Sequence, residues 1–231
     1  SIVIKSQIET NSNQNEIRSK NKESIPLSKH LTSPSFAKPF EKPKLQENGY
    51  EIDVPGDNSC LFWAAALGYV LPVMNKDQVE FEQRFERLFG EAELAKLAPI
   101  YNLLQQFNPF FNEKIFSDVE FNRLVREQFR RRVIEYMSEP EHKEEFKAFW
   151  ASENNALEVS FEDYLSRMHE LTAWGGNLEI RAISKLLSCN LHLTTITGQQ
   201  LKFPDESSDE GINSNALIEL VHVNTDINNT S

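Results

Sequence analysis

Basic residues, cysteine and long apolar runs are all scarce in this sequence. Its 231 residues carry 24 Lys and Arg against 35 Asp and Glu, a formal net charge of -11. Residues 1–49 hold 8 Lys or Arg and 5 Asp or Glu, so that the deficit of basic residues lies in residues 50–231. Binding to a phosphate backbone needs clustered cations that release counterions. We therefore expect protein partners rather than nucleic acid.

The shortage of cysteine and of apolar runs excludes further classes of protein. Two cysteines cannot form a disulfide framework, and with dispersed histidines they offer no ligand spacing for zinc. No run approaches the roughly 18 to 20 apolar residues of a membrane span, and the N-terminus lacks the features of a signal peptide. We expect a monomer of a reducing, cytoplasmic compartment, with no metal, no cofactor and no membrane partner.

The composition divides the chain into two parts. Residues 1–49 are rich in Ser, Asn, Lys, Glu and Pro without a sustained apolar period, which predicts a polar tail or arm that is largely extended or disordered. Residues 50–231 form the predicted domain. Its patterns indicate strands at 50–54, 190–197 and 216–223 and helices at 60–69, 79–88, 91–97, 118–137, 139–150, 160–171 and 178–187. This order predicts an α+β fold with a small, mostly antiparallel sheet packed among several helices.

Cys60 lies where a turn-forming segment, Pro-Gly-Asp-Asn-Ser at 55–59, leads into an apolar helix. The amides and the dipole at a helix N-terminus favour a thiolate, and the same amides can hold an oxyanion. A buried structural cysteine is the other interpretation, because free cysteine is among the most buried residue types. The local pattern leaves both interpretations open. Cys189, at a strand edge, is interpreted as a packing residue.

The segment 55–64, PGDNSCLFWA, resembles the nucleophile motif of the ovarian tumour (OTU) family of cysteine deubiquitinases, Asp-Gly-x-Cys-Leu-Phe before a helix. A second block, YLSRM at 164–168 and WGGNLEIRAI at 174–183, is similar to the family's Tyr-Leu-x-x-Met and Trp-Gly-Gly-x-x-Glu-Leu-x-Ala segment. Weaker similarities lie in NRLVR at 122–126 and LIELVHVN at 217–224. Together these segments cover nearly all of the acidic part of the chain.

The resemblance implies an OTU-like, papain-like cysteine protease fold in residues 50–231. It implies hydrolysis of isopeptide bonds after the C-terminal glycine of ubiquitin, with ubiquitin or polyubiquitin as partner and Cys60 as nucleophile. Asp57 would shape the loop, and Asn58 and Ser59 would belong to the oxyanion loop. Asn58 stands where the family has glycine, and asparagine tolerates the left-handed conformation better than most residues. The Trp-Gly-Gly turn would order the helix behind the site by packing.

A cysteine hydrolase also needs a histidine as base. His222 precedes Asn224 by two residues, the spacing of the family's base and its orienting residue, whereas the other four histidines suit surface or structural positions. The family's histidine is followed by an aromatic residue, but His222 is followed by Val223. We therefore expect His222 in the preceding strand and the catalytic histidine beyond Ser231, so that the domain lacks its C-terminal end.

Two other functions, and one special setting for a deubiquitinase, stay open. A non-catalytic ubiquitin-binding OTU-like module would keep the motifs without a working base. Another cysteine acyl-transfer hydrolase would act on a different isopeptide or thioester. A polar tail rich in Asn and Lys is also compatible with a bacterial effector that acts in the host cytosol. The acidic loop at 204–211 is a candidate for contacting the arginines of the ubiquitin tail, because carboxylates pair with guanidinium groups bidentately.

Overall fold

The computed structural model describes residues 2–6, 50–74, 76–107, 113–153, 159–195, 197–204 and 216–222. Within them a five-stranded sheet has the order β2-β1-β5-β3-β4. Its strands are β1 (Ile2–Ser6), β2 (Tyr50–Asp53), β3 (Asn190–Thr194), β4 (Gln200–Phe203) and β5 (Leu217–His222). The β3–β5 pair is parallel and the three other pairs are antiparallel. This confirms the predicted small, mostly antiparallel sheet.

Strand β1 was not predicted. It lies within the segment 1–49 that we interpreted as a tail, and it pairs with β2 on one side and β5 on the other. A five-residue strand has too weak a local pattern to be recognised without its partners. Residues 7–49 lie outside the described residues, so the division of the chain at residue 49 stays a prediction.

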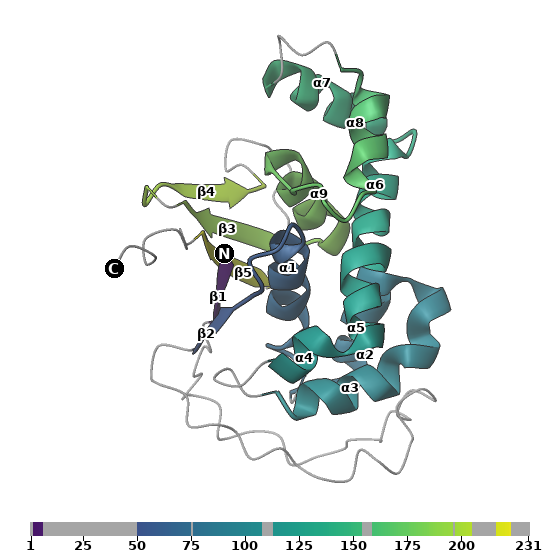
Figure 1. Cartoon of the computed structure of the whole chain (residues 1–231), viewed down its shortest axis with the longest axis vertical. Coiled ribbons are helices and arrows are strands. Elements are labelled where there is room, and N and C mark those ends of the chain that lie inside the picture. The colour runs from purple at the N-terminus through teal and green to yellow at the C-terminus, as the bar shows by residue number, and fades with distance from the viewer. Residues whose placement is uncertain are drawn as a thin grey trace, which may run out of the picture.

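Helix α1 (Cys60–Val70) is the central element of the core. Every one of its residues is buried, as its uniformly apolar sequence predicts. It contacts β1 and β5 on one side and the long helix that contains α6 on the other, and Figure 1 shows it between these two layers. A helix buried on all sides holds the residue at its N-terminus, Cys60, in a fixed position relative to both layers.

The long helix predicted over 118–137 is present but is not uniform. It consists of α5 (Val119–Arg123), the π-helical segment η3 (Leu124–Phe129) and α6 (Arg130–Ser138). The arginines of this helix lie largely off its apolar stripe in the sequence, yet the Arg130 side chain is 1% exposed. Hydrogen bonds of the i→i+5 type shift the helical period, which an interpretation based on 3.6 residues per turn does not include. Arg130 follows directly after this segment.

The remaining helices surround this core, as Figure 1 shows. They are α2 (Gln78–Phe89), η2 (Glu91–Lys96), α3 (Leu97–Gln105), α4 (Glu113–Ser117), α7 (Lys143–Glu153), α8 (Phe161–Met168) and α9 (Asn177–Leu187). Ser160 caps the start of α8, since its hydroxyl accepts the Asp163 N–H at 3.0 Å. The α+β class is confirmed, whereas α3, α4 and β4 were not predicted. None of the helices in the described ranges is long and apolar enough to cross a membrane.

Candidate active site

Cys60 is the first residue of α1 and is 5% exposed, and Ser59 before it is fully buried. Burial raises the pKa of the Cys60 thiol. The main-chain N–H groups of Leu61 and of Cys60 itself lower the pKa, because their dipoles favour the ionised sulfur. The balance keeps the thiol protonated at neutral pH. A reaction at this sulfur therefore needs a base.

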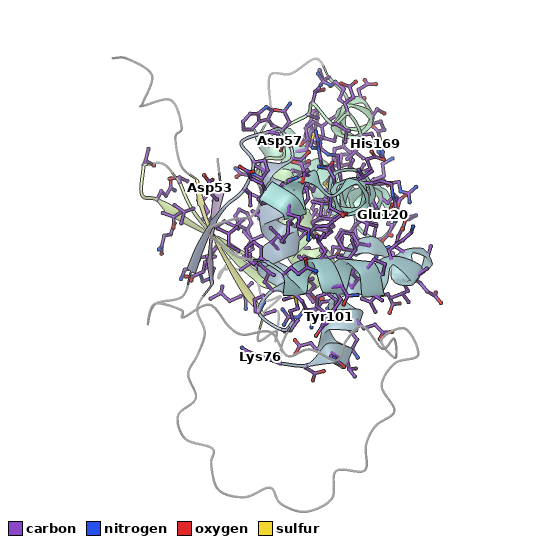
Figure 2. All side chains as sticks on the ribbon, turned by 60° about the horizontal axis from the view of Figure 1, so that its bottom comes forward. Asp53, Asp57, Lys76, Tyr101, Glu120 and His169 are labelled. Atoms are coloured by element: carbon purple, nitrogen blue, oxygen red, sulfur yellow. The ribbon has the colours of Figure 1, made fainter. Side chains whose placement is uncertain are left out.

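Asp57 shapes the loop that leads to Cys60, through its side chain and its main chain. Its Oδ1 accepts the N–H of Ser59 at 2.8 Å, and its main-chain oxygen accepts the N–H of Cys60 at 3.1 Å. Both amides next to the nucleophile thus donate within the loop, and an oxyanion would compete with Asp57 for them. Figure 2 labels Asp57 at this loop. The oxyanion role of Asn58 and Ser59, and the catalytic role of Cys60, stay predictions.

Two arginines of the long helix reach the same loop. Arg126 lies with its Nε 3.3 Å from the Ser59 hydroxyl oxygen and 3.8 Å from Asp57 Oδ2. Arg130 donates from NH2 to the main-chain oxygen of Asn58 at 3.0 Å and to the Ser59 hydroxyl at 3.2 Å. Neither arginine was a candidate site residue from the sequence. An arginine next to a strongly apolar stripe was the only signal that could have indicated Arg130.

The Trp-Gly-Gly segment packs directly on α1 beside Cys60. A Cβ atom on Gly175 would lie 2.6 Å from Cδ2 of Leu61, so any larger residue would force the buried Leu61 side chain to move. Trp174, in contrast, is 58% exposed, and our expectation that it orders the helix behind the site by packing is wrong. The two sequence blocks that carry the resemblance therefore meet at Leu61 and Gly175.

Glu179 fixes the start of α9 next to this contact. Its Oε2 accepts the N–H of Gly176 at 2.7 Å and its Oε1 accepts the Tyr164 hydroxyl at 2.7 Å. The side chain is fully buried, and burial raises its pKa. The Tyr-Leu-x-x-Met helix and the Trp-Gly-Gly turn are thus joined through one carboxyl group. Glu179 has a structural role here and was not among the predicted site residues.

No hydrogen bond joins the Cys60 sulfur to an imidazole in the part of the chain that the structure describes. His169, labelled in Figure 2, is exposed at the end of α8. His142 stacks on Tyr136 with ring centroids 4.0 Å apart, and His192 is half-buried in β3. The backbone of His222 ends β5 opposite Ile2, as expected for a residue within a strand.

Several predicted features lie outside the described residues. They are His30, Asn224, the acidic loop from residue 205 to 211, and the region around Ser231. Among the described side chains no group of three or more His, Cys, Asp or Glu is arranged to hold a metal ion. The expectation of a protein without metal or cofactor stays a prediction.

This chain is similar in sequence to one protein family and in fold to two solved structures. A family model described as "OTU-like cysteine protease" matches residues 112–222, which include the Trp-Gly-Gly block and exclude Cys60. No curated protein sequence matches the chain. Two solved structures share the fold, although their sequence identity is low. One is described as "The structure of h/ceOTUB1-ubiquitin aldehyde-UBCH5B~Ub", with a TM-score of 0.52, 14% identity and coverage of 68% of this chain and 69% of that one.

The second is described as "The structure of a ceOTUB1 ubiquitin aldehyde UBC13~Ub complex". It has a TM-score of 0.53 and 15% identity, and the match covers 69% of this chain and 71% of that one. At such identities the likeness shows the fold. The predicted OTU-like fold is therefore confirmed. The family model matches the part of the chain that carries the second motif block.

Proposed function

We propose that this chain, which belongs to the OTU family of cysteine proteases, hydrolyses isopeptide bonds after the C-terminal glycine of ubiquitin. The observation that carries the proposal is the place of Cys60. It begins a buried helix, follows a loop shaped by Asp57, and contacts the Trp-Gly-Gly block through its neighbour Leu61. The two solved structures of the same fold contain ubiquitin aldehyde, which supports a ubiquitin tail as substrate.

The chemistry at Cys60 would proceed in two steps. The sulfur gives its proton to a base and attacks the glycyl carbonyl carbon, which forms a C–S bond and places negative charge on the carbonyl oxygen. The C–N bond then breaks, and the lysine amine leaves with the proton from the base. Water hydrolyses the thioester in the second step and regenerates the thiol. The raised pKa of Cys60 makes the base essential, because little thiolate is present at neutral pH.

The base is a proposal of its own. We place it in a histidine beyond Ser231, with His222 and Asn224 as the alternative pair within the chain. The strand position of His222 supports this choice, because a strand residue paired with β1 is held in the sheet rather than at a loop. A reducing compartment would keep the Cys60 thiol active, which supports a cytoplasmic location. The comparisons say nothing of a bacterial origin.

A non-catalytic ubiquitin-binding module is the second candidate. It is favoured by one observation, namely that the N–H groups of Ser59 and Cys60 donate to Asp57 and are not free for an oxyanion. Such a module would bind ubiquitin without forming a thioester. An enzyme for another acyl group would react with small alkylating agents but not with ubiquitin-derived probes.

Labelling by a ubiquitin probe with an electrophilic C-terminus separates these functions. The probe is added to this chain, to Cys60→Ala, to His222→Ala and to a longer chain that continues past Ser231, with Cys189→Ala as the matched cysteine control. We expect an adduct that depends on Cys60, survives Cys189→Ala and forms much faster in the longer chain. An adduct on this chain that is lost in His222→Ala would move the base to His222. Ubiquitin binding without labelling in every version would support the binding module.

A further inference from the structure

Arg130 is a buried cation that forms no salt bridge with the residues that the structure describes. Its side chain is 1% exposed at the start of α6, and no carboxylate oxygen lies within 4.0 Å of its nitrogens among the described residues. Burying an unpaired guanidinium group is costly unless hydrogen bonds replace the lost hydration. Arg123, at the end of α5, shows the ordinary arrangement, since it pairs with Glu93 at 2.7 Å and Glu120 at 2.8 Å near the surface. The position of Arg130 therefore needs a different explanation.

The guanidinium group of Arg130 joins two loops that are far apart in the sequence. Its NH1 donates to the main-chain oxygens of Met168, Glu170 and Ala173 at 3.2, 3.1 and 2.9 Å, all between α8 and the Trp-Gly-Gly turn. Its NH2 donates to the oxygen of Asn58 and the hydroxyl of Ser59. One planar cation thus joins the loop before the nucleophile to the loop before α9. We call Arg130 and these five acceptors the arginine clamp.

The clamp controls the orientation of one peptide unit next to Cys60. The carbonyl of Asn58 and the N–H of Ser59 belong to the same planar group and point in opposite directions. Arg130 binds the carbonyl end at 3.0 Å, and Asp57 Oδ1 binds the N–H end at 2.8 Å. A rotation of this peptide would break both bonds. The direction of the amide beside the nucleophile is therefore set jointly by Arg130 and Asp57.

Stacking fixes the plane of the cation. Its Cζ lies 4.4 Å from the ring centroid of Phe62, which is fully buried two residues after Cys60 in α1. The same side chain therefore contacts both the loop before Cys60 and the helix after it. A lysine could not reproduce this arrangement, because its single ammonium group lacks the planar fork that reaches five acceptors.

We propose that Arg130 is a positioning residue for the nucleophile, which holds the Asn58–Ser59 peptide and the start of α1 against the loop before α9 and supplies positive charge beside Cys60. This inference rests on the proposed chemistry at Cys60 but not on the identity of the substrate. Among the described residues, the charged groups that face Arg130 are Asp57 from the loop, Arg126 from η3 and Glu179 from α9. Arg130 and Cys60 also interact electrostatically with one another.

Two substitutions separate position from charge. Arg130→Lys keeps the charge and loses the fork, and Arg130→Gln loses both. Arg123→Gln is the matched control, because it removes one cation from the same long helix without a contact to the Cys60 loop. Each protein is compared for the rate of labelling by the electrophilic ubiquitin probe, for the pH profile of Cys60 alkylation by iodoacetamide, and for its urea unfolding midpoint.

We expect labelling to fall by about 10-fold to 100-fold in both Arg130 variants, since small displacements of a reacting group have effects of this size. The alkylation profile of Cys60 should move to higher pH in Arg130→Gln and stay in place in Arg130→Lys. Arg123→Gln should change neither. Folded Arg130 variants with the wild-type labelling rate and alkylation profile would overturn the proposal.

Ser59→Ala keeps the proposal testable if the Arg130 variants do not fold. It removes the hydroxyl that accepts from both Arg126 and Arg130 and leaves the buried charge of Arg130 in place. Labelling should fall by about threefold to tenfold, the effect of one or two long hydrogen bonds, and an unchanged rate would contradict the clamp. Iodoacetamide does not depend on ubiquitin. A wild-type chain that ignores the ubiquitin probe, while its alkylation still depends on Arg130, would refute the proposed function and support the clamp.

Discussion

The two free cysteines are both buried, but they differ in the polar groups that surround them. Cys189 follows α9 in the core and is fully buried, and burial raises the pKa of its thiol to about 12. Its main chain is fixed by Ser184, whose carbonyl accepts the Cys189 N–H at 3.0 Å and whose hydroxyl donates to the Cys189 carbonyl at 2.7 Å. The charges of Arg84 and Arg87 act against this rise, but no main-chain N–H group is among the causes that lower the pKa of Cys189.

Cys60 is almost as deeply buried, yet its sulfur lies at the start of a helix beside a polar loop. Main-chain N–H groups face its ionised form, and Asp57, Arg126 and Arg130 organise the loop. Burial alone therefore does not distinguish a packing cysteine from a nucleophile. The distinguishing feature is whether the surrounding polar groups can receive negative charge.

The largest effect is expected when each cysteine is replaced in turn. Cys60→Ala should abolish labelling by the electrophilic ubiquitin probe, because the reacting atom is removed. Cys189→Ala should label at the wild-type rate, although the loss of a buried sulfur will lower the unfolding midpoint. Intact-protein mass spectrometry measures both. Labelling that persists in Cys60→Ala would place the reactive thiol elsewhere.

The pH dependence of alkylation is a second test. A raised pKa means that the thiolate of Cys60 accumulates only as the pH rises. The rate with iodoacetamide should therefore increase about tenfold per pH unit from pH 7 to 8.5, past the range where a free cysteine of pKa about 8.5 begins to level off. Cys189 should react only in urea. Peptide mapping identifies the modified residue, and a plateau of the Cys60 rate below pH 8 would contradict the raised pKa.

The close contact between Gly175 and Leu61, beside Cys60, predicts that a larger residue at position 175 lowers the stability of the protein. Gly175→Ala places a methyl group 2.6 Å from Leu61 Cδ2, and Leu61 is buried. We expect a loss of about 1 to 3 kcal/mol in the free energy of unfolding, the usual range for overpacking. Gly56→Ala is the matched control, because no atom lies within 4 Å of its added Cβ. Urea titration compares the two, and equal stability of both variants would refute the close contact.

The smallest effect is expected at Trp174. Its side chain is 58% exposed beside the buried Gly175 contact. Trp174→Ala should change the free energy of unfolding by less than about 0.5 kcal/mol, as for other exposed positions. The same urea titration measures it. A loss comparable with that of Gly175→Ala would show that the indole packs on the domain after all.

Local sequence patterns were sufficient for much of the fold. The uniformly apolar run after residue 60 predicted the buried helix α1. Strands β1 and β4 and helices α3 and α4 were missed, because short segments acquire their conformation from pairing and packing. The same limit applied to Trp174, since an aromatic residue in a turn gives no local indication of which way it faces.

The sequence by itself determined the chemistry that is available: a cysteine after a tight turn, at the start of a helix, with a glycine pair in a second block. Only the tertiary structure decided which residues surround that cysteine. Arg130 lies 70 positions after Cys60 along the chain, and its bonds to Asn58 and Ala173 join segments that no local period relates. Helical and strand periods reflect neighbours within a few residues, whereas the clamp and the Leu61–Gly175 contact arise only when distant segments pack together.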